Sequence, residues 1–257
     1  MQKRWWILMA LLVLTGCTLW CFRAPLSAWV RSMTVQVKTV VGIKPEPDPK
    51  TYASLVSELE RWRLELAARH KRAKTSAERT AAEHDARVIL EQTLPAMMRC
   101  WLGTPWDFNG TAARPGSGKI ACGYFVSTVL MDAGFRVDRY QLAQQPSGNI
   151  MRSFLEKDDC ILSVGKPYEG FAADIQKAEP GIWLLGLDNH VAFLVVADNV
   201  FRMIHSSGSN PWCVVDEDKG HAGALQRSNW RMTGNLTADP KVIRRWLKAE
   251  KITVHGT

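Results

Sequence analysis

One cysteine stands where its surroundings would favour a reactive thiolate. Cys122 follows a loop rich in glycine, asparagine and proline, and it opens an apolar run that continues to Ala133 and ends at Gly134. This pattern predicts a helix with the cysteine in its first turn, where free N–H groups and the positive end of the helix dipole lower the pKa of a thiol. A cysteine on an apolar helix is by itself more often a core residue. Catalysis therefore requires a base as well.

Two histidines on one predicted hairpin could supply that base. His190 begins one apolar strand and His205 ends the next, and Asp198 and Asn199 between the strands suit a two-residue turn. In that register the two histidines are diagonal neighbours on one face of the hairpin. Such residues lie ~7–8 Å apart at Cα, so large side chains can meet. One histidine could then accept the proton of Cys122 while the other orients it.

The elements that would position these residues fall into two groups. Helices are predicted from Pro49 to about Arg72, from a capping box at Thr75 toward Gln92, and, after a restart at Pro95, from 96 to 102. Strands are predicted later in the chain, over 182–187, 191–197, 200–204 and 213–215, and one more helix near 240–250. Helices followed by an antiparallel run indicate an α+β fold.

Length and composition limit the number of domains and the class of protein. The chain has 257 residues, of which 46% are hydrophobic and 23% charged, and these values exclude a disordered chain, a collagen-like fibre and a polytopic membrane protein. The predicted parts are an export signal or membrane anchor, a linker, a helical hairpin, a main domain and a C-terminal extension packed on it. They span 1–22, 23–48, 49–93, 94–216 and 217–257.

The N-terminus predicts export and tethering. A basic head precedes an apolar run from Trp5 to Leu14, and the next residues lead to Cys17. Leu14-Thr15-Gly16-Cys17 resembles the lipobox of bacterial lipoproteins, and that resemblance implies that Cys17 is lipidated. The alternative is an uncleaved anchor, since the chain carries no charge from Trp5 to Phe22 and a spanning helix needs ~17–25 residues. Both alternatives place the rest of the chain outside the cytoplasm, at the membrane.

The charge and the remaining cysteines narrow the choice of partners. The net charge of +8 favours an anionic membrane surface or cell-wall polymer. Nucleic acid is not expected, because no helix-turn-helix, zinc-finger or RNA-binding signature occurs. No cofactor is predicted, and a Cys/His metal site lacks closely spaced ligands. Outside the cytoplasm disulfides can form, but the sequence does not pair Cys21, Cys100, Cys160 and Cys213.

The segment from about Pro95 to Val215 resembles the NlpC-type cell-wall endopeptidases, a bacterial branch of the papain-like cysteine peptidases. The resemblance implies a papain-like fold with Cys122 as nucleophile, His190 as base and His205 as the residue that orients it. Five motifs carry it in chain order: Leu102-Gly103-Thr104-Pro105-Trp106, Ala121-Cys122-Gly123-Tyr124-Phe125-Val126, Pro180-Gly181-Ile182, His190-Val191-Ala192 and Ile204-His205-Ser206.

Four positions depart from the family pattern. Ala121 stands in place of an aspartate, Gly123 in place of a serine, and Ile182 where the family has an acid. Trp106 stands where the family has a tyrosine whose hydroxyl helps to bind the oxyanion. The indole N–H of Trp106 is a donor, so this residue could serve the oxyanion site or simply pack in the wall.

The sequence thus predicts a membrane-tethered thiol hydrolase of the cell envelope. A Cys–His–His triad would cleave an amide or peptide bond, with peptidoglycan peptides as the expected substrate, and the same chemistry could instead transfer an acyl group. The alternative is a non-catalytic module on the same fold that binds envelope glycan or peptide. The residues at positions 121 and 123 favour that alternative.

Overall fold

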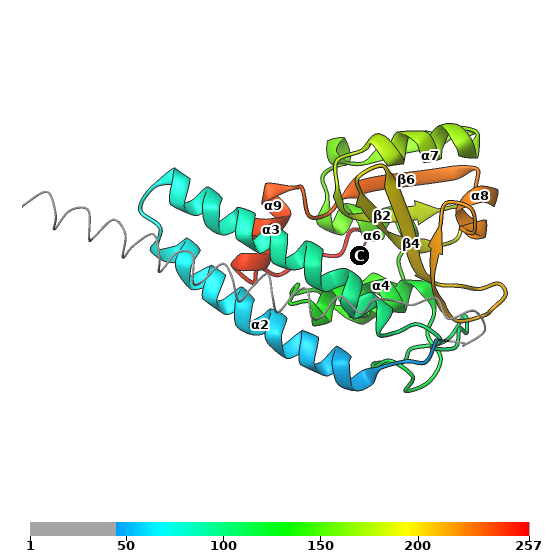
Figure 1. Ribbon diagram of the computed structural model, residues 1–257, viewed down its shortest axis with the longest axis horizontal. Coiled ribbons are helices and arrows are strands. Elements are labelled where there is room, and N and C mark those ends of the chain that lie inside the picture. The colour runs from blue at the N-terminus through cyan, green and yellow to red at the C-terminus, as the bar shows by residue number, and fades with distance from the viewer. Residues whose placement is uncertain (1–44, 257) are drawn as a thin grey trace, which may run out of the picture. The chain divides into compact units, whose positions relative to one another are not determined.

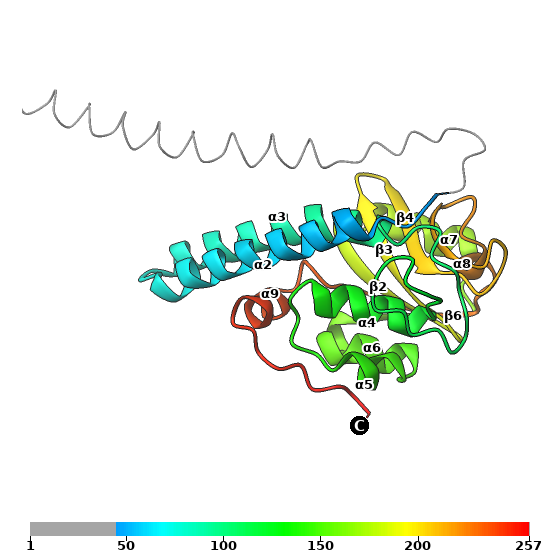
Figure 2. The same cartoon turned by 90° about the horizontal axis from the view of Figure 1, so that it is seen from below.

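Two long helices begin the part of the chain described by the structure, a computed structural model that covers residues 45–256. Helix α2 spans Pro49–Arg72 and helix α3 spans Ser76–Arg99, and they lie side by side (Figures 1 and 2). Both predicted N-termini are confirmed. The Asp48 carboxylate accepts a hydrogen bond from the N–H of Thr51, and Thr75 with Glu78 forms a capping box.

The predicted restart of a separate helix at Pro95 is wrong. Helix α3 continues through this proline to Arg99, although proline removes one helical hydrogen bond. The neighbouring side chains explain why the helix persists, because Leu94, Met97 and Met98 are completely buried in the core. Tertiary packing here outweighs the local preference. The predicted boundary between residues 93 and 94 consequently falls inside one helix.

A six-stranded antiparallel sheet forms the centre of the described structure. Its strand order is β1-β6-β2-β3-β4-β5, and eight α-helices of the described chain accompany it, which confirms the α+β class. The predicted strands correspond to β2 to β5, whereas β1 and β6 were not expected. The strands are β1 Ile161–Val164, β2 Gly181–Leu187, β3 Val191–Ala197, β4 Val200–Ser206, β5 Val214–Asp218 and β6 Trp230–Asn235.

The predicted register of the β3–β4 hairpin is confirmed. Ala197 pairs with Val200, and Phe193 pairs with Ile204. Asn199 in the turn has a φ of 58°, a left-handed conformation that asparagine tolerates better than most residues. This register determines which face of the sheet each histidine occupies.

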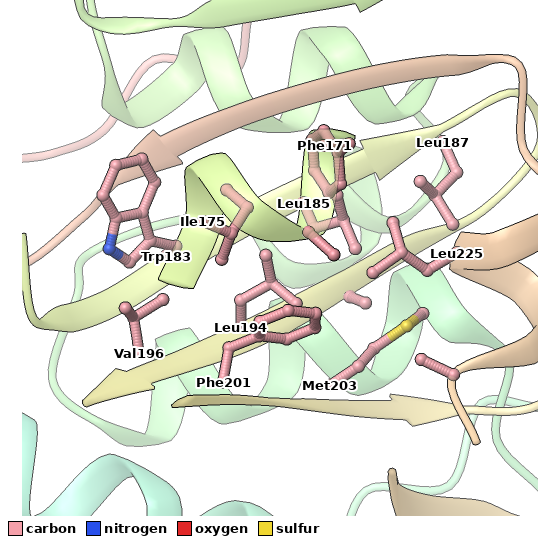
Figure 3. Packing of buried hydrophobic residues seen from close by; sticks show 13 residues of the cluster. Phe171, Ile175, Trp183, Leu185, Leu187, Leu194, Val196, Phe201, Met203 and Leu225 are labelled. Carbon is pink, nitrogen blue, oxygen red and sulfur yellow. The ribbon is translucent and has the colours of Figure 1, made fainter. Parts of the chain in front are cut away.

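Helices cover the two faces of the sheet. Helix α7 (Tyr168–Lys177) lies on one face, with the short α8 (Gly223–Arg227) beside it, and helix α4 (Cys122–Asp132) lies on the other (Figure 1). Figure 3 shows the core under α7, in which Phe171 and Ile175 meet side chains of β2, β3 and β4. On the opposite face, Phe125 of α4 contacts Phe193 edge-on, with ring centroids 6.1 Å apart.

The C-terminal part of the chain joins the hairpin to the rest of the molecule. Helix α9 (Pro240–Leu247) matches the predicted helix, and its Trp246 is fully buried, with Nε1 donating to the carbonyl of Ala133 at 2.7 Å. Arg244 pairs with Glu83 of α3 at 3.2 Å. All described residues belong to one compact unit. The region predicted as a C-terminal extension also contributes β6, which lies between β1 and β2.

The last described residues return toward helices α5 (Arg139–Ala143) and α6 (Ser147–Phe154), with the 3₁₀ turn Lys157–Asp159 just beyond them. The N–H of His255 donates to the Ser153 hydroxyl at 2.9 Å. Gly256 lies so close to Asn149 that a Cβ on this glycine would stand 2.3 Å from the amide nitrogen of Asn149, and 3.0 Å from the amide oxygen of Gln145. Residues 255 and 256 are therefore packed against α6 and the segment that links it to α5.

The predicted signal or anchor, with Cys17, lies outside the described residues. Within residues 45–256 no helix combines the length and the apolar character needed to cross a membrane. Cys100 and Cys160, two of the candidates for a disulfide, carry free thiols.

Candidate active site

Cys122 is the first residue of α4, as the sequence predicted. Ala121 is the N-cap and offers no side-chain hydrogen bond, so the first N–H groups of the helix are not capped by a side chain. The preceding loop is attached to the sheet, because the hydroxyl of Ser206 at the end of β4 donates to the carbonyl of Ile120 at 2.7 Å. This contact ties the start of α4 to the strand that carries His205.

The two histidines meet, as the predicted register requires. His190 Nε2 lies 2.7 Å from His205 Nδ1, and the two rings stand at 85° with centroids 4.8 Å apart. His190 is half-buried and lies in the turn before β3. The N–H of Leu187 donates to the carbonyl of His190 and closes this turn. His205 on β4 is only 1% exposed, so water has little access to its ring.

The site contains an acid that the sequence analysis missed. Glu217 Oε2 lies 3.0 Å from His205 Nε2. In the β4–β5 register His205 pairs with Val215 and Met203 pairs with Glu217, so Glu217 is a diagonal neighbour of His205 on the same face. The predicted strand ended at residue 215, and extending it by one more pair of residues would have revealed the acid.

Cys122 and His190 line the same two pockets, with volumes of about 570 and 1090 Å³. The side-chain hydrogen bonds of residues 45–256 do not include one between Cys122 Sγ and His190. The N–H of Val191, next to His190, instead favours the thiolate, as do those of Gly123 and Cys122 itself. The structure thus places the thiol at the start of β3, beside the histidine pair, without a direct bond between them.

The resting site is electrically neutral at Cys122 and His190. Burial raises the pKa of the Cys122 thiol above its ordinary value and outweighs the backbone N–H groups that lower it. Burial, and next the neighbouring His205, lower the pKa of His190 to about 3. Around pH 7 the Cys122 thiol therefore keeps its proton, and the His190 imidazole is neutral. A preformed thiolate–imidazolium pair is not the resting state.

Trp106 lies in the wall of the larger pocket, which it lines together with Cys122, His190 and His205. Its ring contacts Trp212, with centroids 5.4 Å apart, and packs so closely on Gly208 that a Cβ there would lie 3.0 Å from a ring carbon. None of the hydrogen bonds found in the described chain uses the indole N–H. Trp106 therefore fills part of the pocket wall, and its indole N–H has no hydrogen-bond partner within the described chain.

The close packing of α4 on α5 leaves no room for a side chain at Gly123. A Cβ at Gly123 would lie 2.4 Å from the carbonyl oxygen of Ala143, far closer than a real contact allows. The serine of the family pattern therefore does not fit here unless α5 moves. This departure has a steric cause and leaves Cys122 at the helix start.

The pocket walls are mostly neutral. Apart from the histidines, Asp188 and Arg227 are the charged residues that line the two pockets of the described structure. Amide and hydroxyl groups dominate the polar lining, and Trp106, Phe108, Tyr124 and Trp230 form apolar parts of the walls. Such walls suit a ligand rich in amide and hydroxyl groups.

In residues 45–256 no three His, Cys, Asp or Glu side chains gather in a way that could hold a metal ion. Comparison with models of protein families, with curated proteins and with solved structures finds no match to this chain.

Proposed function

We propose that this chain is a thiol hydrolase that cleaves an amide or peptide bond, with Cys122 as nucleophile and His190 as base. The observation that carries the proposal is the shared pocket: an uncapped helix start presents Cys122 beside a hydrogen-bonded histidine pair. Chain order and motifs support an NlpC-type, papain-like assignment of the domain. We further propose tethering through residues 1–22, outside the cytoplasm, with peptidoglycan peptides as the substrate.

The neutral resting state defines the first chemical step. His190 takes the proton of Cys122 while the sulfur attacks the substrate carbonyl, so a separate ion pair is not needed beforehand. The N–H of Cys122, assisted by Trp106 Nε1, stabilises the oxyanion. His190 then returns the proton to the leaving amine, which leaves a thioester on the sulfur. Water hydrolyses the thioester and restores the thiol.

The second candidate is a binding module that keeps the cleft without the reaction. Two observations favour it: Cys122 and His190 share no hydrogen bond, and the pKa of the thiol is raised rather than lowered. Both are also expected of a resting hydrolase whose geometry tightens only when substrate binds. Product analysis separates the two candidates.

The decisive experiment incubates purified peptidoglycan with the full-length wild type, with Cys122→Ala and with Cys160→Ala. Cys160 is a matched control, because it is a half-buried free thiol outside both pockets. We expect mass analysis to find new peptide fragments from wild type and Cys160→Ala, and none from Cys122→Ala. Equal release by Cys122→Ala overturns the role of the thiol. Binding of peptidoglycan by wild type without any release supports the binding module instead.

A further inference from the structure

The proton positions on the two histidines can be derived from a single acidic side chain. An ionised carboxylate only accepts hydrogen bonds, so the bond between Glu217 Oε2 and His205 Nε2 places a proton on that nitrogen. A neutral His205 then has a lone pair on Nδ1. The 2.7 Å contact from this atom to His190 Nε2 requires the proton to be on His190 Nε2. His190 Nδ1 is thereby left with a lone pair.

We infer that Glu217 is a positioning residue that fixes both histidines as Nε2–H tautomers, so that Nδ1 of His190 is the nitrogen that accepts the proton of Cys122. The consequence for Cys122 rests on the proposed hydrolase function, whereas the tautomers themselves do not. His190 Nε2 is occupied by His205, so Nδ1 is the ring nitrogen that remains for the thiol.

The contacts around Glu217 support a dedicated role. Its neighbour Asp216 pairs with Arg99 and Arg202, as a structural acid on this strand would. Glu217 has His205 as its hydrogen-bond partner, and no lysine or arginine of the described chain pairs with it. Because His205 is 1% exposed, water does not readily replace the carboxylate.

Loss of the Glu217 carboxylate would reverse the direction of the hydrogen bond between His190 and His205. Without Glu217 the buried Nε2–H of His205 has no partner, and the alternative tautomer with the proton on Nδ1 becomes favourable. His205 Nδ1 would then donate to His190 Nε2, and His190 would carry its own proton on Nδ1. That form of His190 has no lone pair to offer Cys122.

The test compares Glu217→Gln, which keeps an acceptor oxygen without the charge, with Glu217→Leu, which removes both. Glu169→Leu is the control, because Glu169 is an exposed acid on α7 paired with Lys219. Two-bond ¹H–¹⁵N spectra of the full-length protein report each histidine tautomer. We expect Nε2–H at both positions in wild type, Glu169→Leu and Glu217→Gln, and Nδ1–H in Glu217→Leu. An Nδ1–H form of either histidine in wild type, or unchanged tautomers in Glu217→Leu, overturns the inference.

Turnover provides the second readout. On peptidoglycan we expect kcat to fall roughly 10²–10⁴-fold in Glu217→Leu, the range known for a triad histidine held in the wrong tautomer or without one of its partners, with KM nearly unchanged. Glu217→Gln should stay within about tenfold of wild type. Equal losses in both variants would mean that the charge matters rather than the tautomer, and would overturn the inference. If wild type releases no fragments, the hydrolase proposal fails while the spectra still decide the role of Glu217.

Discussion

The ionisation of His190 determines how activity should depend on pH. Its pKa is lowered to about 3, so the basic form is present well below the ordinary histidine value of about 6.5. The raised pKa of Cys122 keeps the nucleophile protonated through neutral pH. Because the reactive form is neutral thiol with neutral imidazole, kcat/KM should form a plateau whose acid limb lies clearly below pH 6.

This prediction is checked by measuring kcat/KM on a soluble peptide substrate between about pH 4 and pH 9, with circular dichroism at each pH to verify folding. An enzyme that depends on a preformed thiolate–imidazolium pair would instead lose activity as the pH rises, because the imidazolium then gives up its proton. Loss of activity above neutral pH would therefore contradict the neutral resting state, and an acid limb near pH 6.5 would contradict the lowered pKa of His190. The sequence alone does not predict these pKa shifts, because they depend on how deeply Cys122 and His190 are buried.

The sequence identified Cys122, Trp106 and both histidines as site residues, but not Glu217. Helix-start chemistry identified Cys122, and the turn at Asp198 and Asn199 set the register that joins the two histidines. Glu217 was missed because three consecutive acidic residues follow Val215, and such a run does not resemble a strand. Only the pairing with β4 makes the extension of β5 evident, and that pairing is a tertiary fact.

The contact between α4 and α5 is the element-scale feature that shapes the site. Gly123→Ser introduces a Cβ that would meet the Ala143 carbonyl at 2.4 Å, so α5 must shift away from the helix that carries Cys122. Overpacking of this kind costs about 1–3 kcal/mol. We expect the urea midpoint of unfolding to fall, and activity to fall as well, although serine is the residue of the family pattern.

Gly170→Ser on α7 is the matched control. A Cβ there meets only the flexible side chain of Lys166, at 3.3 Å, so the unfolding midpoint should change little. Gly123→Ser with wild-type stability and increased activity would contradict the steric explanation for this glycine.

Local features of the sequence explain why strands β1 and β6 were not predicted. Strand β1 is a four-residue edge whose apolar residues Ile161, Leu162 and Val164 are all more than half exposed, so it lacks the alternation of a half-buried strand. Strand β6 contains Arg231 and Gly234, residues that do not favour a buried strand. Yet Arg231 is 2% exposed, because backbone carbonyls such as that of Lys166 accept its hydrogen bonds.

At the scale of the whole molecule, Trp246 connects α4 with α2, two helices that the sequence assigned to different parts of the chain. Its Nε1 bonds to the end of α4, and its own carbonyl accepts from Arg63 of α2 at 3.5 Å. We expect Trp246→Ala to lower the free energy of unfolding by about 3–5 kcal/mol, whereas Trp246→Phe, which keeps a ring, loses less.

Urea titrations followed by tryptophan fluorescence and by far-ultraviolet circular dichroism check this prediction. One coincident transition is expected in wild type, because the hairpin and the sheet share a single core. Separate transitions for the two signals in wild type would mean that the helical hairpin folds independently. The sequence could not foresee the shared core, since helix patterns predict which face is apolar but not which distant element covers it.

The position of the chain end has a practical consequence for biochemistry on this protein. Gly256 touches Gln145 and Asn149, and both of these residues line the pocket that contains Cys122. An affinity tag that follows this segment would begin close to two residues of the pocket wall and could disturb them. Recombinant protein for the activity assays should therefore carry any tag away from Gly256.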